Sequence, residues 1–140
     1  MRKLFFIIQL LLIPFTSCYS QKIVQKQTEV YKLIEQKDKF IGKPLSVLLS
    51  EITIPIKAFS TVKENAPGGF LVLMFDRYDS IRQWRSKGNQ GLILKVKIKE
   101  AFNWNNNLRK KEDIFKWLKE DEEKYKNLTV AYLSITGEPM

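Results

Sequence analysis

Histidine is absent from the 140-residue sequence, and cysteine occurs once, as Cys18. Without histidine the chain has no Ser-His-Asp triad, no Cys-His pair and no histidine-ligated zinc site. Because no cysteine follows Cys18, the rest of the chain forms no internal disulfide and carries no thiolate nucleophile. An enzyme built on this sequence would have to use carboxylates, lysine, tyrosine or serine.

Charge is missing from residues 4–15, an apolar run that follows Arg2 and Lys3. Small residues at 16–20 complete the pattern of an export signal. Twelve helical residues rise only about 18 Å, which is short of the roughly 30 Å hydrocarbon core of a bilayer. We therefore predict a cleaved signal peptide at 1–20 and a periplasmic or extracellular protein.

Cys18 allows a second interpretation of this leader. The segment Phe15-Thr-Ser-Cys18 resembles the lipobox of bacterial lipoproteins, in which small residues precede the cysteine that becomes the lipidated first residue. The usual residue three positions before that cysteine is leucine, and here it is Phe15. Two mature N-termini stay open: a free Gln21, or a lipidated Cys18 that anchors the protein to a membrane.

Without Arg2 and Lys3 the predicted mature chain has 22 basic and 15 acidic residues, a net charge of +7. The basic excess lies in residues 21–111, which contain 18 basic and 8 acidic residues. An exported basic protein seldom meets nucleic acid, so the expected partners are anionic envelope components or an acidic protein. No nucleic acid, metal or cofactor is expected.

Residues 21–140 have the length of one globular domain. Apolar periodicity and turn residues predict helices over 23–38, 44–51, 80–87 and 110–125, and strands over 52–62, 70–75, 92–99 and 129–135. Pro55 predicts that the first strand is an edge strand or is bulged. We expect an α+β fold, in which an antiparallel sheet of about four strands is covered on one face by two N-terminal helices and one C-terminal helix.

Segment 77–87 combines cationic and aromatic residues. The six candidate binding residues are Arg77, Tyr78, Arg82, Trp84, Arg85 and Lys87. Guanidinium groups bind phosphate or carboxylate through two parallel hydrogen bonds, and aromatic side chains add contact area at low entropic cost. In the competing interpretation, Ile81 and Trp84 anchor this helix to the core and the arginines are only solvated.

Three lysines alternate with apolar residues in the strand predicted before the C-terminal helix: Lys95, Lys97 and Lys99. Their side chains should project from one face of the sheet. They either extend the basic surface of segment 77–87 or discourage aggregation between sheets. The two interpretations differ in whether Arg82 and Arg85 lie on the same side of the sheet as the lysines.

Three further patterns only weakly resemble chemical sites. Ser60-x-x-Lys63 has a serine–lysine spacing without its companion motifs, Asp76 and Asp79 lie at a strand-to-helix corner, and residues 120–123 are acidic without calcium-loop spacing. We interpret them as the end of a strand, as a helix cap with partners for nearby arginines, and as a solvated helix face.

The main functional hypothesis is a small exported, non-catalytic binding protein that contacts its anionic partner through segment 77–87. A second hypothesis is a periplasmic inhibitor or immunity-type protein that blocks an exported enzyme by its shape. A third is a histidine-free hydrolase or lyase, which requires a deep pocket with two carboxylates of well-separated pKa.

Overall fold

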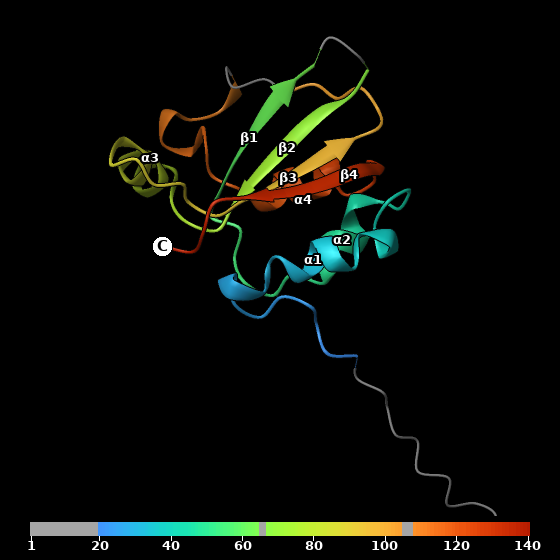
Figure 1. Cartoon of the computed structure of the whole chain (residues 1–140). Coiled ribbons are helices and arrows are strands. Elements are labelled where there is room, and N and C mark those ends of the chain that lie inside the picture. Colours follow the sequence, from blue (N-terminus) through green and yellow to red (C-terminus); the bar gives the residue numbers. More distant parts are fainter. Residues whose placement is uncertain (1–19, 65–66, 105–107) are drawn as a thin grey trace, which may run out of the picture.

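The computed structural model describes residues 20–64, 67–104 and 108–140, which form an α+β fold around one antiparallel sheet (Figure 1). The strands are β1 (Ala58–Lys63), β2 (Gly69–Met74), β3 (Ile93–Ile98) and β4 (Val130–Thr136), and they lie side by side in chain order. The α-helices are α1 (Lys32–Glu35), α2 (Leu45–Ser50), α3 (Tyr78–Ser86) and α4 (Lys119–Tyr125). The predicted fold class is confirmed. Cys18 and the rest of the predicted leader through residue 19 lie outside the described residues.

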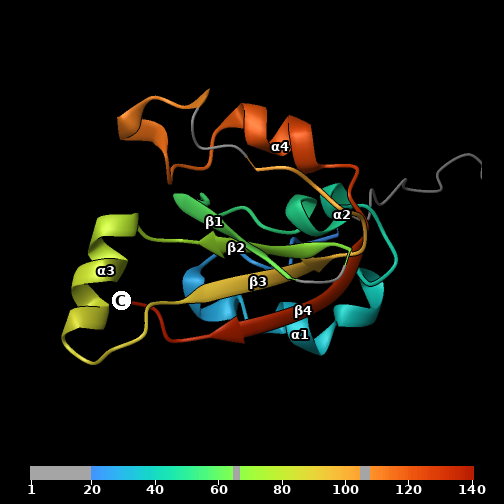
Figure 2. The same cartoon turned by 90° about the horizontal axis from the view of Figure 1, so that it is seen from above.

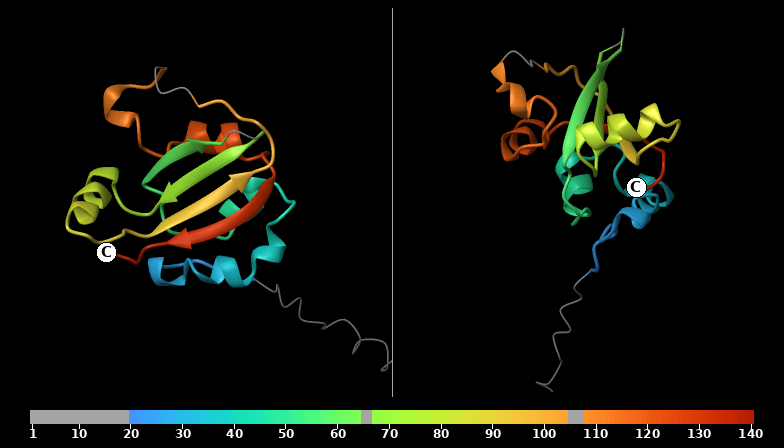
Figure 3. Two further views of the ribbon diagram at one scale, coloured as in Figure 1. Left: turned by 45° about the horizontal axis from the view of Figure 1, so that its top comes forward. Right: turned by 90° about the vertical axis from the view of Figure 1, so that its left-hand side faces the viewer.

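The two faces of the sheet have different surroundings. On the covered face, the main core contains Phe59, Leu71, Leu73, Leu94, Val96 and Leu133, together with buried side chains of the N-terminal segment, α2 and α4. On the opposite face, here called the open face, α3 covers one end of the sheet, where Ile81 packs on Ala58, Met74 and Ile93. Figure 3 (right) shows α3 and α4 on opposite sides of the sheet.

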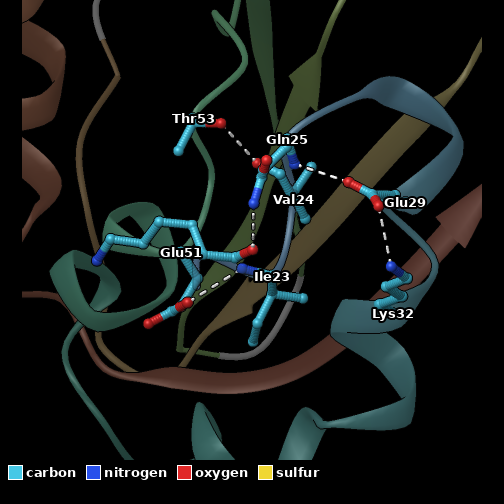
Figure 4. A network of polar contacts seen from close by, with 8 residues as sticks. Ile23, Val24, Gln25, Glu29, Lys32, Glu51 and Thr53 are labelled. Atoms are coloured by element: carbon cyan, nitrogen blue, oxygen red, sulfur yellow. Dashed lines mark hydrogen bonds and ion pairs between the residues drawn. The ribbon is translucent and has the colours of Figure 1, made fainter. Parts of the chain in front are cut away.

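The N-terminal segment is not the continuous helix predicted over 23–38. The peptide N–H of Val24 donates to the carbonyl of Glu51 (3.0 Å), and the N–H of Thr53 donates to the carbonyl of Val24 (2.9 Å). The Thr53 hydroxyl donates to the same carbonyl, as Figure 4 shows. The Glu51 carboxylate also accepts a hydrogen bond from the N–H of Ile23 at 3.2 Å. This pairing holds the backbone extended, so helical hydrogen bonds cannot begin at residue 23.

Short helical turns follow that extended entry. They are the 3₁₀ turns η2 (Gln27–Glu29) and η3 (Lys37–Lys39), with α1 between them. The buried residues Val30, Leu33 and Phe40 still turn toward the core, so the apolar spacing is used although the helix is broken. Figure 2 shows α1 alongside β4.

The predicted helix over 110–125 is also interrupted. Its beginning is a 3₁₀ turn, η5 (Lys111–Asp113), and its end is α4, with extended backbone at Leu118 between them. The carbonyl of Phe115 accepts a hydrogen bond from the N–H of Phe59 at 2.8 Å. This segment therefore pairs with the outer edge of β1, and the pairing replaces helical hydrogen bonds.

β1 begins at Ala58 and not at residue 52, because the preceding segment leaves the sheet. Pro55 has no N–H for a ladder, and the half-buried Ile52, Ile54 and Ile56 pack against the main core from outside the strands. β1 lies at an edge of the sheet, as Pro55 predicted. Within the described ranges, no helix has the length and apolarity needed to cross a bilayer.

Candidate functional site

The first turn of α3 is held against the segment that pairs with β1. The rings of Tyr78 and Phe115 are stacked, with centroids 3.9 Å apart and an interplanar angle of 12°. On the sheet side, Ile81 is buried and fixes the helix to the open face. Two contacts, one on each flank, therefore set the orientation of α3 and of the arginines at its N-terminal end.

A groove of about 420 Å³ runs between this part of α3 and the segment around η5. Five cationic side chains line it, namely Lys57, Arg77, Arg82, Lys111 and Lys116. Asp79 and Glu112 are the acidic side chains in the lining, and the Tyr78–Phe115 stack supplies an aromatic wall. We call this the basic groove, and its lining has an excess of three positive charges.

Two of the five cations are already paired with carboxylates. Lys57 Nζ is 3.8 Å from Asp76, and Lys116 Nζ is 2.8 Å from Asp113. The hydrogen bond from Lys116 lowers the pKa of the Asp113 carboxyl. Among the described residues, the other three cations have no carboxylate oxygen within 4.0 Å: Arg77, Arg82 and Lys111.

The structure therefore divides the six predicted binding residues. Arg77, Tyr78 and Arg82 line the basic groove, whereas Arg85, Trp84 and Lys87 do not. Trp84 is half-buried beside a separate hollow at the far end of α3, next to the C-terminal residues 137–139. The sequence stretch is continuous, but the helix distributes its side chains around the axis and places them in two separate surroundings.

Residues far from 77–87 in the sequence complete the groove. Lys57 comes from the entry to β1, and Lys111 comes from η5. Phe115 reaches Tyr78 because its backbone pairs with Phe59 of β1. The adjacent Lys110 and Lys111 are a visible basic signal in the sequence, but only this long-range pairing brings them beside α3.

Arg109 anchors the same segment from the covered face. Its guanidinium donates to both Asp121 carboxylate oxygens (2.8 and 3.2 Å) and to the carbonyl of Lys116 (2.9 Å). The guanidinium carbon lies 4.9 Å from the ring centre of Trp104 and 5.4 Å from that of Phe59. Arg109 is half-buried and holds the segment in place by these contacts. The sequence analysis did not identify it.

Tyr125 lies in the same aromatic surroundings. Its ring packs edge to face with Phe59 and Phe102, and its hydroxyl is buried without a partner among the described residues. Burial, with a smaller contribution from the Asp121 charge, raises the pKa of Tyr125 to about 12. The hydroxyl therefore stays neutral at physiological pH and belongs to the core.

The weak chemical patterns do not assemble into sites. Ser60 and Lys63 are three positions apart in β1, so their side chains leave opposite faces of the strand. Asp76 contacts Lys57 and not an arginine. The N-cap of α3 is Arg77, without a hydrogen bond from a capping side chain, so the expected helix cap by these aspartates is wrong. In the described parts of the chain, no group of three acidic residues is arranged to hold a metal ion.

The predicted lysine row is placed by the strand register. Lys95 and Lys97 stand opposite Val72 and Phe70, on the face of the sheet that α3 covers at one end. Lys99 follows the end of β3 and is exposed. α3 and the two strand lysines therefore lie on the same side of the sheet, which favours the interpretation of an extended basic surface.

Comparison of the chain with protein-family models, curated proteins and solved structures finds no match.

Proposed function

We propose that this protein is an exported, non-catalytic binding protein that holds an anionic group of its partner in the basic groove. The observation that carries the proposal is the convergence of Arg77, Arg82 and Lys111, which come from two separate segments and have no carboxylate partner among the described residues. The leader at 1–20 supports export. The partner is an anionic envelope component or an acidic protein.

The chemistry of the groove suits a phosphate, sulfate or carboxylate group. The two guanidinium groups bind such oxygens through paired hydrogen bonds, and the ammonium of Lys111 adds a compact charge. The first turn of α3 lines the groove and has no side-chain cap, so its free N–H groups add positive potential. The neighbouring stack of Tyr78 and Phe115 provides an aromatic surface. An apolar part of the ligand, next to its anionic group, can pack on this surface.

The test uses residues 21–140 and four probes, which separate the possible partners. Vesicles of phosphatidylglycerol represent anionic lipid, heparin represents acidic glycan, poly-L-glutamate represents acidic protein, and phosphatidylcholine vesicles are the neutral control. Amide chemical shifts measured by NMR during titration report where each probe binds. The proposal expects the largest shifts at Arg77, Arg82 and Lys111 with at least one anionic probe.

A matched pair of variants distinguishes the groove from general positive charge. Arg77→Gln with Arg82→Gln removes two groove cations. Arg85→Gln with Lys87→Gln removes two cations at the C-terminal end of α3, which lie outside the groove. We expect the first variant to weaken binding about tenfold or more and the second to weaken it about threefold or less. Equal losses of affinity in the two variants would mean that the probes bind by unspecific charge attraction and not in the basic groove.

A further inference from the structure

α3 leaves the far end of the open face exposed. Two rows of side chains cross the sheet there, Val62–Phe70–Lys97–Tyr132 and Ser60–Val72–Lys95–Ser134. Val62 and Tyr132 are 50% and 49% exposed, and Phe70 is half-buried between them. Single exposed apolar residues are ordinary on protein surfaces, but here they lie in one cross-strand row. We call Val62, Phe70, Lys95, Lys97 and Tyr132 the open-face patch.

Lys97 is held in position in the middle of this patch. Its ammonium lies 5.5 Å above the centre of the Phe70 ring and 2.9 Å from the Glu64 carboxylate. Lys95 lies one step further toward α3 in the same strand, roughly 7 Å away along the strand, and none of the ion pairs among the described residues involves it. The row of exposed apolar side chains thus contains one fixed cation, Lys97, and is bordered by one available cation, Lys95.

This composition resembles that of a protein–protein interface. Such interfaces are enriched in tyrosine and phenylalanine at the centre and have a polar rim. The sign of the charge selects the partner, because carboxylates placed over Lys95 and Lys97 are attracted and cations are repelled. We propose that the open-face patch is a docking surface for an acidic segment of a partner protein, whose apolar side chains cover Val62, Phe70 and Tyr132.

Other occupants fit the patch less well. A second copy of this chain, placed face to face, would bring two patches of the same net positive charge together. A polyanion such as an acidic glycan would meet Glu64 beside Lys97 and would leave the apolar row uncovered. The inference concerns the sheet and not the basic groove, so it goes beyond the proposed function.

The test measures binding of a fluorescent glutamate–tyrosine copolymer by anisotropy. All proteins carry Arg77→Gln and Arg82→Gln, so that the basic groove does not contribute and the outcome is independent of its function. Val62→Ser with Tyr132→Ser is expected to weaken binding about tenfold. The matched control is Tyr31→Ser with Val47→Ser, which changes the same two residue types at other exposed positions, 53% exposed at the N-cap of α1 and 38% exposed in α2. It is expected to leave binding unchanged.

Two charge variants test the role of the lysines. Lys95→Gln is expected to weaken copolymer binding about threefold, whereas Glu64→Gln is expected to strengthen it because Lys97 is released and a like charge is removed. If the Lys97–Glu64 pair had only a structural role, Glu64→Gln would not tighten copolymer binding. Sedimentation velocity on the same proteins checks for a dimer through this face.

Several results would overturn the inference. The first is equal copolymer binding by the Val62→Ser, Tyr132→Ser variant and its control. The second is binding of poly-L-glutamate as tight as that of the copolymer, which would leave no role for the apolar row. The third is heparin binding that depends on Tyr132 when copolymer binding does not. This result would mean that the partner is an acidic polysaccharide and not an acidic protein.

Discussion

Replacing Arg109 with methionine removes the side chain that holds the segment around η5 against the sheet. The substitution deletes two hydrogen bonds to Asp121, one to the Lys116 carbonyl, and the contact of the guanidinium with Trp104. Methionine fills much of the same volume, so the main loss is electrostatic. The Asp121 side chain is only 8% exposed and would be left as a buried charge without its partner.

Removal of one member of a buried ion pair costs about 3–5 kcal/mol, because the remaining charge has lost its solvent and its partner. The Arg109 side chain is 12% exposed, so we expect the lower end of this range, about 3 kcal/mol. With an m-value of about 2 kcal/mol per M, the urea midpoint would fall by about 1.5 M. Tryptophan fluorescence follows the transition, since Trp104 and Trp117 flank Phe59 beside the pair.

A second substitution tests the cause of this loss. Asp121→Asn in the Arg109→Met protein removes the unpaired charge and keeps an oxygen that can accept from the N–H of Leu118. We expect the double variant to be more stable than Arg109→Met alone. Lys126→Met, which breaks the exposed pair with Glu123, serves as the control and should lower the stability much less than Arg109→Met does.

The reasoning is refuted if Arg109→Met unfolds within about 0.5 kcal/mol of the unmodified chain, the range of ordinary surface substitutions. It is also refuted if Asp121→Asn lowers the stability of the Arg109→Met protein further. The second result would mean that the carboxylate contributes through Leu118 alone and that its charge is not buried.

Two further predictions concern other parts of the fold. The hydrogen bonds from the Thr129 hydroxyl and N–H lower the pKa of Glu100. The stability from this contact is therefore present above the unfolded pKa of Glu100 and is lost as pH falls through the folded pKa. Carboxyl NMR titration should show a pKa below the ordinary value for glutamate, and this pKa should rise in Thr129→Ala. Gly137 has a φ of +79°, and a Cβ there would overlap the Gly91 carbonyl oxygen, so Gly137→Ala should destabilise the protein by at least about 2 kcal/mol in thermal or urea unfolding. Gly42 is the control, because it has a φ of +77° and open space around it. Gly42→Ala should cost about 1–2 kcal/mol of stability. Equal losses in Gly42→Ala and Gly137→Ala would mean that the overlap of the new Cβ with the Gly91 carbonyl is relieved.

Local patterns in the sequence were enough to predict the sheet and α3. The two-residue alternation of β3 and the apolar run of β2 reflect only which face of each strand is buried. Both strands lie within about one residue of their predicted bounds. The helix predicted over 23–38 failed because the bridge of Val24 to Ile52 joins positions 28 residues apart. No local periodicity reports a pairing of that kind.

The residues of the candidate site were also predicted where the signal is local and missed where it depends on long-range pairing. Arg77, Tyr78 and Arg82 were predicted because they are neighbours in one helix. Lys57 and Lys111 were missed because long-range pairing brings them beside that helix. Lys57 pairs with Met74 at the end of β2, and Lys111 belongs to the segment that pairs with the outer edge of β1. A cluster of cations in a sequence thus predicts the charge of a surface, whereas the topology of the sheet decides which of its members share a groove.

The most direct measurement for the central proposal is the salt dependence of heparin binding by residues 21–140. If the three unpaired groove cations displace counterions from a linear polyanion as they would from DNA, the logarithm of affinity falls with the logarithm of salt at a slope of about −2.7, roughly 40-fold between 50 and 200 mM. In the Arg77→Gln, Arg82→Gln protein the slope should fall to about −0.9. A slope that is the same in the two proteins would contradict the proposal that the basic groove is the anion-binding site.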